Sequence, residues 1–259
     1  MTAFVDKYGP WALVAGASEG LGAAFAESLA KRNVNLILVA RRGDLLNALA
    51  VKLSTGYGIE ATTQPFDLAD TARLPEFIES LSVPVGLLVY TAAFAPVGDF
   101  ANIQTELLQR VVDINITAPL LMSRLLAPAM IARSRGGIIL MSSLAGDQGS
   151  PRISAYAASK AFNAVLAEGL WGELRTQGVD VIASRAGAIR TPGYLAKGTA
   201  EAPGTLDAAE VAEQTLSALG KAPSVVPGAI NKLASFVLTR LAPRKAAISI
   251  MASNTRDLT

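Results

Sequence analysis

The residues best suited to acid–base chemistry in this chain are Tyr156 and Lys160, which lie four positions apart. On a helix, side chains at this spacing share a face one turn apart, so the phenol and the ammonium would point the same way. A phenol with a pKa near ~10 is a poor proton donor at neutral pH, and a neighbouring ammonium stabilises the phenolate and lowers that pKa. Ser143 ends an apolar, strand-like run, where its hydroxyl is expected to bind the oxygen that the phenol protonates. The same spacing also occurs by chance, in helices whose tyrosine packs and whose lysine faces water.

Cysteine and histidine are both absent from the chain. A disulfide framework and thiolate chemistry are therefore excluded. Catalytic triads that need an imidazole base are excluded as well, and so are most zinc sites, so no metal site is expected. Acid–base work must fall to tyrosine, lysine, aspartate or glutamate.

The charge of the chain is small overall but uneven. The net charge of +2 argues against a nucleic-acid-binding protein that works by neutralising phosphates. Residues 221–259 carry a net charge of +5, which leaves −3 for residues 1–220. The charged residues of this C-terminal segment are Lys221, Lys232, Arg240, Arg244, Lys245, Arg256 and Asp257.

With 259 residues, of which 51% are hydrophobic, the chain is long enough for one large α/β domain. The N-terminus lacks the charged-then-apolar order of a secretion signal, and no apolar run reaches the length of a membrane span. We therefore expect a cytoplasmic, soluble enzyme. We find no linker or internal repeat, so residues 1–259 are expected to form a single domain.

Apolar runs alternate with amphipathic stretches along the whole chain. Near-continuous apolar strands separated by helices indicate a parallel sheet that is covered on both faces, here a doubly wound, Rossmann-type α/β fold of about seven strands. Ligands of such sheets bind outside the carboxyl ends of the strands. The expected strands are 11–15, 35–40, 60–66, 85–91, 137–141, 179–184 and 225–226, and the expected helices are 20–31, 44–53, 71–81, 105–133, 154–175 and 208–219.

A glycine-rich turn follows the first expected strand. Its spacing is Gly-x-x-x-Gly-x-Gly, and glycines in a strand-to-helix turn let a ligand approach the backbone closely. The N-terminus of the following helix offers free N–H groups to a pyrophosphate. A turn without a ligand is the alternative, but the position between strand and helix favours dinucleotide binding. The residues of this turn are Gly16, Ala17, Ser18, Glu19, Gly20, Leu21 and Gly22.

Two arginines, Arg41 and Arg42, follow the second expected strand. An acidic residue there would bind the ribose 2′-hydroxyl of NAD, whereas arginine suits the 2′-phosphate of NADP. Ser18 is expected to add a hydroxyl to the same phosphate. We therefore expect NADP(H) rather than NAD(H), with two solvated bases at a helix start as the alternative.

Taken together, these features resemble the short-chain dehydrogenase/reductase family over about residues 10–195. The glycine turn, Asp67-Leu68, Asn115, Ser143 and the Tyr156–Lys160 pair occur in the order and at the spacing of that family. The joint pattern is specific although each part is weak.

The resemblance implies a role for each of these residues. Tyr156 would transfer the proton, Lys160 would bind the nicotinamide ribose and lower the tyrosine pKa, and Ser143 would polarise the carbonyl. Asn115 would anchor a water that connects Lys160 to solvent, or simply bond to backbone as an interior polar residue. The remaining cofactor contacts implied are Asp67 at the adenine amino group, Leu68 beside the ring, Ala92 and Ala93 along the adenosine, and Ile189 and Thr191 at the nicotinamide carboxamide. For Asp67, a helix cap ahead of Thr71 is the alternative.

Two departures from the family pattern affect loops. The family usually has Asn-Asn-Ala-Gly after the fourth strand, where this chain has Tyr90-Thr91-Ala92-Ala93, and its usual Pro-Gly after the sixth strand is here Ala186-Gly187. The first asparagine normally ties strands together, so Tyr90 must be accommodated differently. Neither change touches the proton-transfer residues.

Three stretches are expected to line the substrate pocket: 94–100, 144–153 and 192–205. Apolar side chains outnumber charges there, which favours an apolar carbonyl substrate over a sugar. The last stretch, with its glycines and prolines, suits a mobile lid. The apolar members are Phe94, Leu144, Ile153, Tyr194 and Leu195, and the lid residues are Gly193, Gly198, Pro203 and Gly204.

The segment 221–259 is expected to be a basic, amphipathic C-terminal extension. Its apolar residues trace one helical face, with Lys232 and Arg240 off that face. Such a face can bind a membrane surface, but more often it covers the protein's own core or a subunit interface. The face consists of Ile230, Leu233, Phe236, Val237 and Leu241.

The function expected is hydride transfer between NADP(H) and a ketone or secondary alcohol, with an acyl- or steroid-like substrate. The alternatives are a non-catalytic NADP-binding sensor or scaffold, and an epimerase or dehydratase on the same fold. The intact Asn115, Ser143, Tyr156 and Lys160 set disfavours the sensor, and the apolar pocket disfavours the nucleotide-sugar enzyme. Family resemblance further implies a homodimer or homotetramer.

Overall fold

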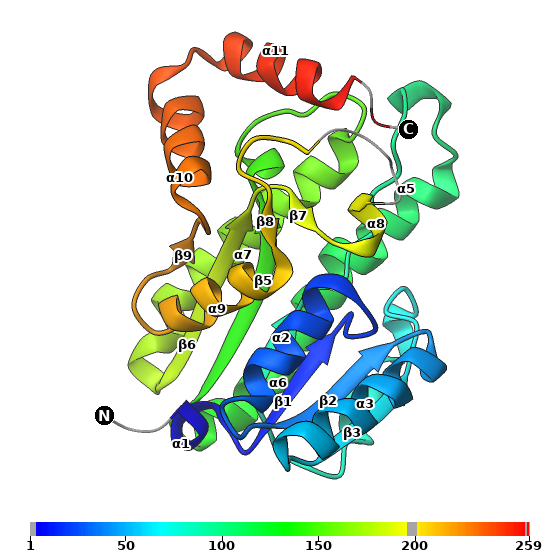
Figure 1. The fold of residues 1–259 in the computed structure, drawn as a ribbon, viewed down its shortest axis with the longest axis vertical. Coiled ribbons are helices and arrows are strands. Elements are labelled where there is room, and N and C mark those ends of the chain that lie inside the picture. The colour runs from blue at the N-terminus through cyan, green and yellow to red at the C-terminus, as the bar shows by residue number, and fades with distance from the viewer. Residues whose placement is uncertain (1–3, 196–200, 257, 259) are drawn as a thin grey trace.

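A seven-stranded parallel sheet organises the computed structural model, which describes residues 4–195, 201–256 and 258 (Figure 1). The strand order is β3-β2-β1-β4-β5-β6-β9, so the sheet grows outward in both directions from β1. The strands are β1 (Trp11–Ala15), β2 (Asn35–Ala40), β3 (Ala61–Pro65), β4 (Val85–Tyr90), β5 (Gly136–Ser143), β6 (Val179–Ala186) and β9 (Ser224–Val225), and β7 (Ile189–Arg190) pairs with β8 (Leu206–Asp207) in a separate two-stranded sheet.

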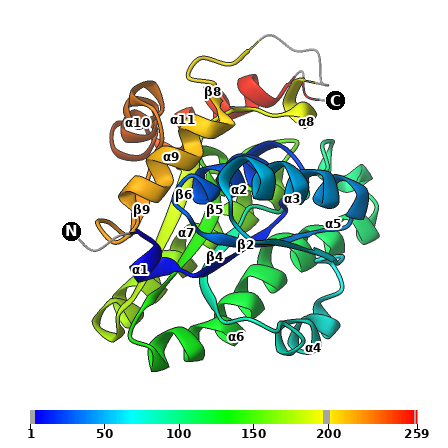
Figure 2. The same cartoon turned by 60° about the horizontal axis from the view of Figure 1, so that its bottom comes forward.

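Helices cover both faces of the sheet, so the expected doubly wound α/β fold is confirmed (Figure 2). Successive residues of β1 point to opposite faces and enter two separate apolar clusters, which is why the whole strand is apolar. The helices are α1 (Phe4–Tyr8), α2 (Gly20–Ala30), α3 (Gly43–Tyr57), α4 (Leu74–Glu79), α5 (Thr105–Val112), α6 (Ala118–Ala132), α7 (Ser154–Leu174), α8 (Pro192–Leu195), α9 (Ala208–Ala218), α10 (Ala229–Phe236) and α11 (Arg244–Thr255).

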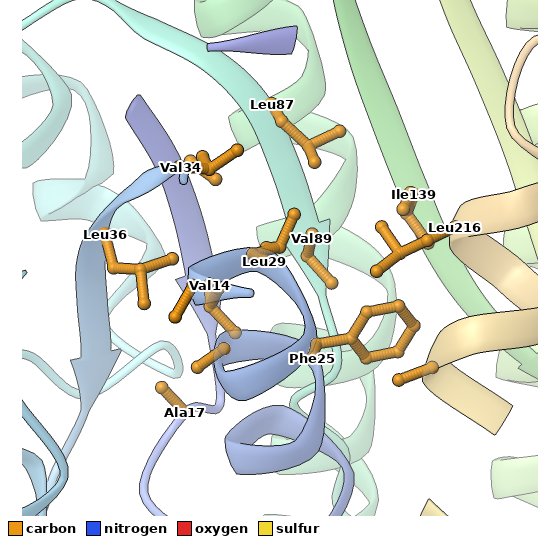
Figure 3. Packing of buried hydrophobic residues seen from close by; sticks show 14 of the residues in the cluster. Val14, Ala17, Phe25, Leu29, Val34, Leu36, Leu87, Val89, Ile139 and Leu216 are labelled. Carbon is orange, nitrogen blue, oxygen red and sulfur yellow. The ribbon is translucent and has the colours of Figure 1, made fainter. Parts of the chain in front are cut away.

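The first cluster lies under α2, α3 and α9. Val14 and Leu36 of the sheet pack there against Phe25 and Leu29 of α2, and Leu216 of α9 closes the cluster (Figure 3). The second cluster lies under α4, α6 and α7 on the opposite face. The packing of helices on both faces holds the parallel strands in place, so the carboxyl ends of β1, β4 and β5 lie at the same edge of the sheet.

A π turn, Asp113–Thr117, interrupts the expected long helix between α5 and α6. Pro119 follows directly, in the first turn of α6, and its missing N–H removes the α-helical donor to the carbonyl of Asn115. The helix continues through Pro128 to Ala132. The change of helical pattern therefore lies next to Pro119, and neither proline ends the helix.

The continuous helix Thr105–Ala132 is long and apolar enough to cross a membrane by length and composition, with a mean hydropathy of 1.4 over 18 residues. We expected no apolar run of that length. Met122, Leu126 and Met130 pack in the second cluster, however, and 44% of the window is buried inside the protein. The helix therefore covers the sheet.

The C-terminal extension is not one helix, as the apolar period had suggested. α10 is followed by a second π turn, Val237–Leu241, and the chain then turns at Pro243 into α11. We call residues 229–256 the arm. It lies beyond the carboxyl ends of the central strands (Figure 1).

Candidate active site

Tyr156 and Lys160 lie in the first two turns of α7, as their spacing predicts. The ammonium nitrogen of Lys160 is 5.5 Å from the centre of the Tyr156 ring. Both residues line one large cavity together with Ser143, the last residue of β5. The structure therefore brings the three residues proposed for proton handling to one wall.

Lys160 is 3% exposed, and its ammonium donates to the carbonyl of Met141 at 3.0 Å. The hydroxyl of Ser142 donates to the Lys160 carbonyl at 2.7 Å, which fixes α7 to β5 from the other side. Burial lowers the pKa of Lys160 to about 8. The charge of this lysine is therefore sensitive to what enters the cavity.

Burial raises the pKa of Tyr156, and a hydrogen bond with the Ser143 side chain partly opposes the rise. Desolvation is therefore the dominant influence on the pKa of this phenol in the protein on its own, and the expectation that Lys160 lowers the pKa stays a prediction. Ser143 Oγ also accepts the N–H of Ala145 at 3.2 Å, which anchors the hydroxyl at the end of the strand. The phenol thus rests in its neutral form.

Asn115 is fully buried in the π turn and clamps the loop after β4. Its side-chain amide accepts from Phe94 N and donates to Phe94 O, both at 2.8 Å, and it also donates to Ser159 Oγ at 3.0 Å. Ser159 in turn donates to the carbonyl of Tyr156 at 2.7 Å. These contacts are those of an interior polar residue bonded to backbone; the water relay stays a prediction.

Asn163 supports the site from behind Asn115, and its role was not predicted from the sequence. Its amide donates to the carbonyl of Asn115 at 3.0 Å, the carbonyl that Pro119 deprives of an α-helical donor. A proline four positions after a buried asparagine could have drawn attention to that carbonyl, but nothing in the sequence identifies Asn163 as its donor.

The glycine turn is close-packed against the loop after β4. A Cβ at Gly22 would lie 2.0 Å from the Gly16 carbonyl oxygen, and one at Gly16, where φ is +91°, would lie 2.6 Å from Ala92 N. Gly20 begins α2, so the helix N-terminus opens onto the cavity. Because these glycines have no side chains, the backbone N–H groups at the start of the helix are accessible to a pyrophosphate.

Ser18, Glu19 and Arg42 meet at the rim of the cavity. The Arg42 guanidinium donates to Ser18 Oγ at 3.1 Å and pairs with the Glu19 carboxylate at 2.7 Å. Arg41 is exposed next to it and also lines the cavity. The predicted 2′-phosphate group of residues is therefore assembled, with Glu19 as an additional anionic partner of Arg42.

Asp67 lines the cavity beside Leu68, but it is not the helix cap that we considered. Its carboxylate accepts the Ala69 N–H at 3.0 Å and pairs with Arg110 at 3.0 Å. Although burial alone would raise it, these two contacts lower the pKa of Asp67 overall. Arg110, whose guanidinium also lies 5.8 Å from the Phe94 ring, was not predicted.

The structure shows how Tyr90 and Thr91 are accommodated where the family usually has two asparagines. Tyr90 is 1% exposed and donates to the Ile114 carbonyl at 2.5 Å, which ties β4 to the π turn. Thr91 Oγ1 donates to the Ala15 carbonyl at 2.8 Å and so links β4 to β1. The strand-tying contact expected of an asparagine is thus made by the threonine.

The cavity has a volume of about 810 Å³ and runs from the arginine rim to α7. Most of the predicted site residues line it, but Asn115 does not, and neither do Phe100 and Leu195, which are 62% and 59% exposed. Of the lid, Gly198 falls outside the described residues, and in the described part Tyr194 Oη accepts the Ala202 N–H at 3.0 Å. Ile189, Thr191, Ala92 and Ala93 all line the cavity, as predicted.

The arm also lines the cavity, which the sequence did not predict. Ala234 and Leu238 reach it from the α10 side and Met251 and Asn254 from α11. Asn231 of α10 lines it as well, so the arm contributes the polar side chains of Asn231 and Asn254 beside the three apolar ones. One wall of the cavity is therefore built from the C-terminal extension.

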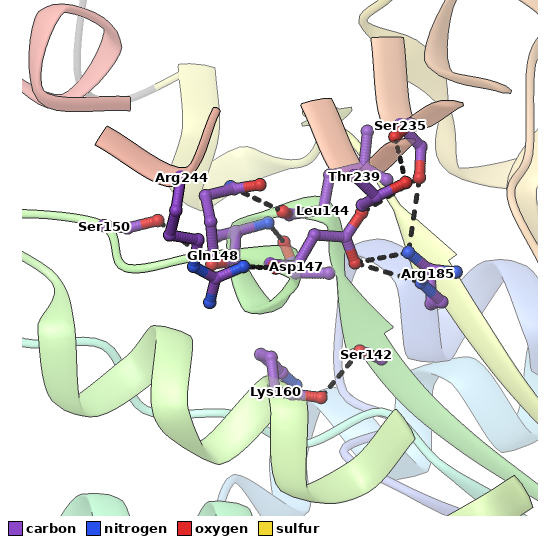
Figure 4. A network of polar contacts seen from close by, with 12 residues as sticks. Ser142, Leu144, Asp147, Gln148, Ser150, Lys160, Arg185, Ser235, Thr239 and Arg244 are labelled. Atoms are coloured by element: carbon purple, nitrogen blue, oxygen red, sulfur yellow. Dashed lines mark hydrogen bonds and ion pairs between the residues drawn. The ribbon is translucent and has the colours of Figure 1, made fainter. Parts of the chain in front are cut away.

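A polar network ties the arm to the strand ends (Figure 4). Asp147, which follows β5, accepts from Arg185 of β6 at 2.5 Å and from Ser235 of α10 at 2.9 Å. Arg244 donates to the Asp147 carbonyl at 2.8 Å. Within the described parts of the chain, no group of three histidine, cysteine, aspartate or glutamate residues could bind a metal ion.

Comparison with known proteins gives a consistent result. Residues 10–201 match the sequence model of the family described as short chain dehydrogenase. A 7beta-hydroxysteroid dehydrogenase of Collinsella aerofaciens is 30% identical over 88% of this chain and 89% of its own length. A very-long-chain 3-oxoacyl-CoA reductase of Podospora anserina is 38% identical over 68% of this chain, which spans about half of that relative's length.

Solved structures agree with this result. A structure from work on 7beta-hydroxysteroid dehydrogenase stereoselectivity superimposes with a TM-score of 0.90, at 27% identity, over 96% of this chain and 99% of its own. A short-chain dehydrogenase from Sphingobium yanoikuyae in complex with NADPH has a TM-score of 0.76, at 30% identity, over 84% of this chain and 87% of its own.

Proposed function

This chain belongs to the short-chain dehydrogenase/reductase family, and on that premise we propose that it reduces an apolar ketone, or oxidises the matching secondary alcohol, with NADP(H). The observation that carries the proposal is the convergence of Tyr156, Lys160 and Ser143 with the glycine turn on one cavity. A sensor or scaffold has no use for a partly buried proton donor in the same cavity as that turn. The alternative of a non-catalytic binding protein is therefore disfavoured.

The residues present fit a dinucleotide. The bare backbone at Gly16–Gly22 would receive the pyrophosphate, and Asp67 and Leu68 would contact the adenine. Arg42 and Ser18 already share a hydrogen bond and would bind a 2′-phosphate, which favours NADP(H) over NAD(H). When bound, the cofactor supplies the hydride chemistry.

The chain's own residues handle the proton and the carbonyl. Tyr156 Oη donates the proton to the substrate oxygen in reduction and removes it in oxidation. The Ser143 hydroxyl, fixed by Ala145 N, polarises that oxygen. Lys160 would hold the nicotinamide ribose when cofactor is bound, and its ammonium would favour the phenolate of Tyr156 during oxidation.

The substrate is proposed to be a bulky apolar ketone of steroid or acyl type. Phe94, Val97, Leu144 and Ile153 line the cavity from the body of the protein, and the arm adds further apolar side chains. The volume of about 810 Å³ has to accommodate the cofactor and the substrate together. Relatives named for a hydroxysteroid and for a 3-oxoacyl-CoA support these two classes.

The test is turnover of NADPH with a panel of steroid and 3-oxoacyl ketones. We expect Tyr156→Phe to lose on the order of 10²-fold or more in kcat while NADPH still binds. Tyr57→Phe is the matched control, because its hydroxyl donates to Glu27 at 2.9 Å and neither residue lines the cavity. Turnover of Tyr156→Phe within a few fold of wild type would refute the assignment.

A homo-oligomer is also proposed. Val165 of α7 is 68% exposed, and Val112 and Leu120 on the neighbouring α5 and α6 are each 40% exposed. Exposed apolar side chains on helices that pack against one another suit a subunit interface. Light scattering after size-exclusion chromatography should show a dimer or tetramer, and Val165→Asp should dissociate it.

A further inference from the structure

Helix α10 carries its polar residues inward and its apolar residues outward. Asn231 and Ser235 are 4% and 6% exposed and bond to the body of the protein, whereas Ile230, Leu233 and Phe236 are 61%, 65% and 56% exposed. Asn231 donates to the carbonyls of Gly204 and Pro227, both at 3.0 Å. A surface helix of a water-soluble body normally shows the opposite arrangement.

The outward apolar surface continues along the arm. Val237 and Leu241 of the second π turn are 38% and 66% exposed, and Ile250 of α11 is 45% exposed. Scattered single apolar residues are normal on a protein surface, but a contiguous set on one projecting element marks a binding surface.

The arm is also the most basic part of the chain. From residue 214 to residue 256 the sequence has no aspartate or glutamate. None of the ion pairs found among residues 4–195 and 201–256 involves a base of the arm, so its positive charge is not balanced locally. The bases are Lys232, Arg240, Arg244, Lys245 and Arg256.

We propose that the arm docks this protein on an anionic lipid surface. The exposed side chains of Ile230, Leu233, Phe236 and Leu241 enter the boundary between headgroups and acyl chains, and the flanking bases contact anionic headgroups. Both halves of this signature, an apolar face and excess positive charge, are present on the same helices. The earlier expectation that this face covers the protein's own core is wrong, because the face is exposed.

A second copy of the chain explains the arm less well. A two-fold interface brings the same patch of each subunit together, so the unpaired bases of one arm would face those of the other. An anionic surface instead supplies the opposite charge along the whole arm.

Docking would place the cavity beside the lipid. Ala234 and Leu238 line the cavity from the same helical segment that exposes Leu233 and Leu241, and Met251 lines it from α11. An apolar molecule that leaves the lipid would then contact the apolar side chains with which the arm lines the cavity. The docking itself does not depend on the reaction proposed above, so either can fail alone.

The test is co-sedimentation of the full chain with vesicles of phosphatidylcholine alone and with about one third phosphatidylglycerol. We expect binding to the anionic vesicles that weakens with salt, because surface charges are screened. Each base near such a surface contributes about fivefold to partitioning. Changing Lys232 and Arg240 to Gln should therefore weaken binding about 25-fold.

The apolar contribution is tested with Leu233→Asp and Phe236→Asp, each expected to weaken vesicle binding at least about tenfold. Val51→Asp is the matched control, because Val51 is equally exposed, at 66%, on α3. Thermal melts and NADPH binding establish that each variant is folded. The proposal is overturned if the wild type does not bind vesicles. It is also overturned, in favour of a protein interface, if Leu233→Asp converts a dimer to a monomer in light scattering without changing vesicle binding.

Discussion

Within the glycine turn of the proposed cofactor site, Gly22 is the position with the least room for a Cβ, so Gly22→Ala is the most direct test of the turn. The added Cβ would lie 2.0 Å from Gly16 O and 2.9 Å from Ala17 Cα, distances that real Cβ atoms essentially never show. The turn must therefore open by about 1 Å. It cannot do so freely, because Gly16 is itself packed against Ala92 N.

Two effects oppose each other in this variant. Alanine in place of glycine favours the helix by up to about 1 kcal/mol, whereas forcing a methyl group into packed atoms costs about 1–3 kcal/mol. The clash is with backbone, so it should dominate and leave a net loss of about 1–2 kcal/mol. For a chain of this size that lowers Tm by about 2–8 °C. The displaced N–H groups should also weaken NADPH binding about tenfold or more.

The assay is differential scanning fluorimetry together with an NADPH titration by fluorescence. Gly56→Ala is the control, because no atom lies within 4 Å of a Cβ at that position in α3. We expect this control to melt at or slightly above the wild-type temperature and to bind NADPH normally. A Gly22→Ala protein that matches wild type in both measurements would refute the reasoning about the turn.

Three further predictions concern single contacts. Arg42→Ala should raise the Kd for NADPH about tenfold or more and leave the Kd for NADH nearly unchanged. Glu19→Gln should lower the Kd for NADPH, because it removes a carboxylate that competes for Arg42. Equal effects of either variant on both cofactors would contradict this assignment. The pKa of Lys160 is lowered from 10.5 to about 8, so between pH 8 and 10 the unfolded chain binds more protons than the folded one and stability should rise with pH. Urea unfolding of cofactor-free protein should show this rise in wild type and not in Lys160→Met; identical slopes would count against it. Tyr90→Phe deprives the Ile114 carbonyl of its donor and should lower the free energy of unfolding by about 1–3 kcal/mol, and a change below about 0.3 kcal/mol in urea titrations would show that the bond contributes nothing.

The fold could be predicted from the sequence because its strands are buried on both faces. Residues 11–15 and 36–40 are continuous apolar runs between glycine, proline and polar residues. β1 has the bounds of the first run, and β2 consists of the second run and Asn35. The bounds of β3 were predicted less accurately, since β3 is shorter than expected. It is an edge strand rich in threonine and glutamine, so no apolar run marks where it begins and ends. α1 was missed because five residues are too few for a helical period to show.

The spacing of motifs in the sequence predicted which residues form the site, but it did not predict the contacts that those residues make. Asp113–Thr117 has an ordinary helical composition, so nothing local distinguishes a π turn from an α turn there. Arg110 and Asn163 reach the site only through tertiary packing. For α10 the apolar period correctly gave a helix and a face, but a period cannot say whether that face points inward or outward.

The pairing of β1 with β4 has a consequence for how the chain acquires its cofactor site during synthesis. Thr91 follows Ala15 by 76 positions, and the glycine turn is packed only when the segment after β4 has arrived. At a ribosomal rate of about 5–20 residues per second, the nascent turn waits about 4–15 s for that segment. β2 and β3 can pair with β1 in the meantime, but β1 keeps an open edge until β4 emerges. The nascent chain is therefore most exposed to strand-edge association in this interval, and cofactor cannot protect it before the interval ends.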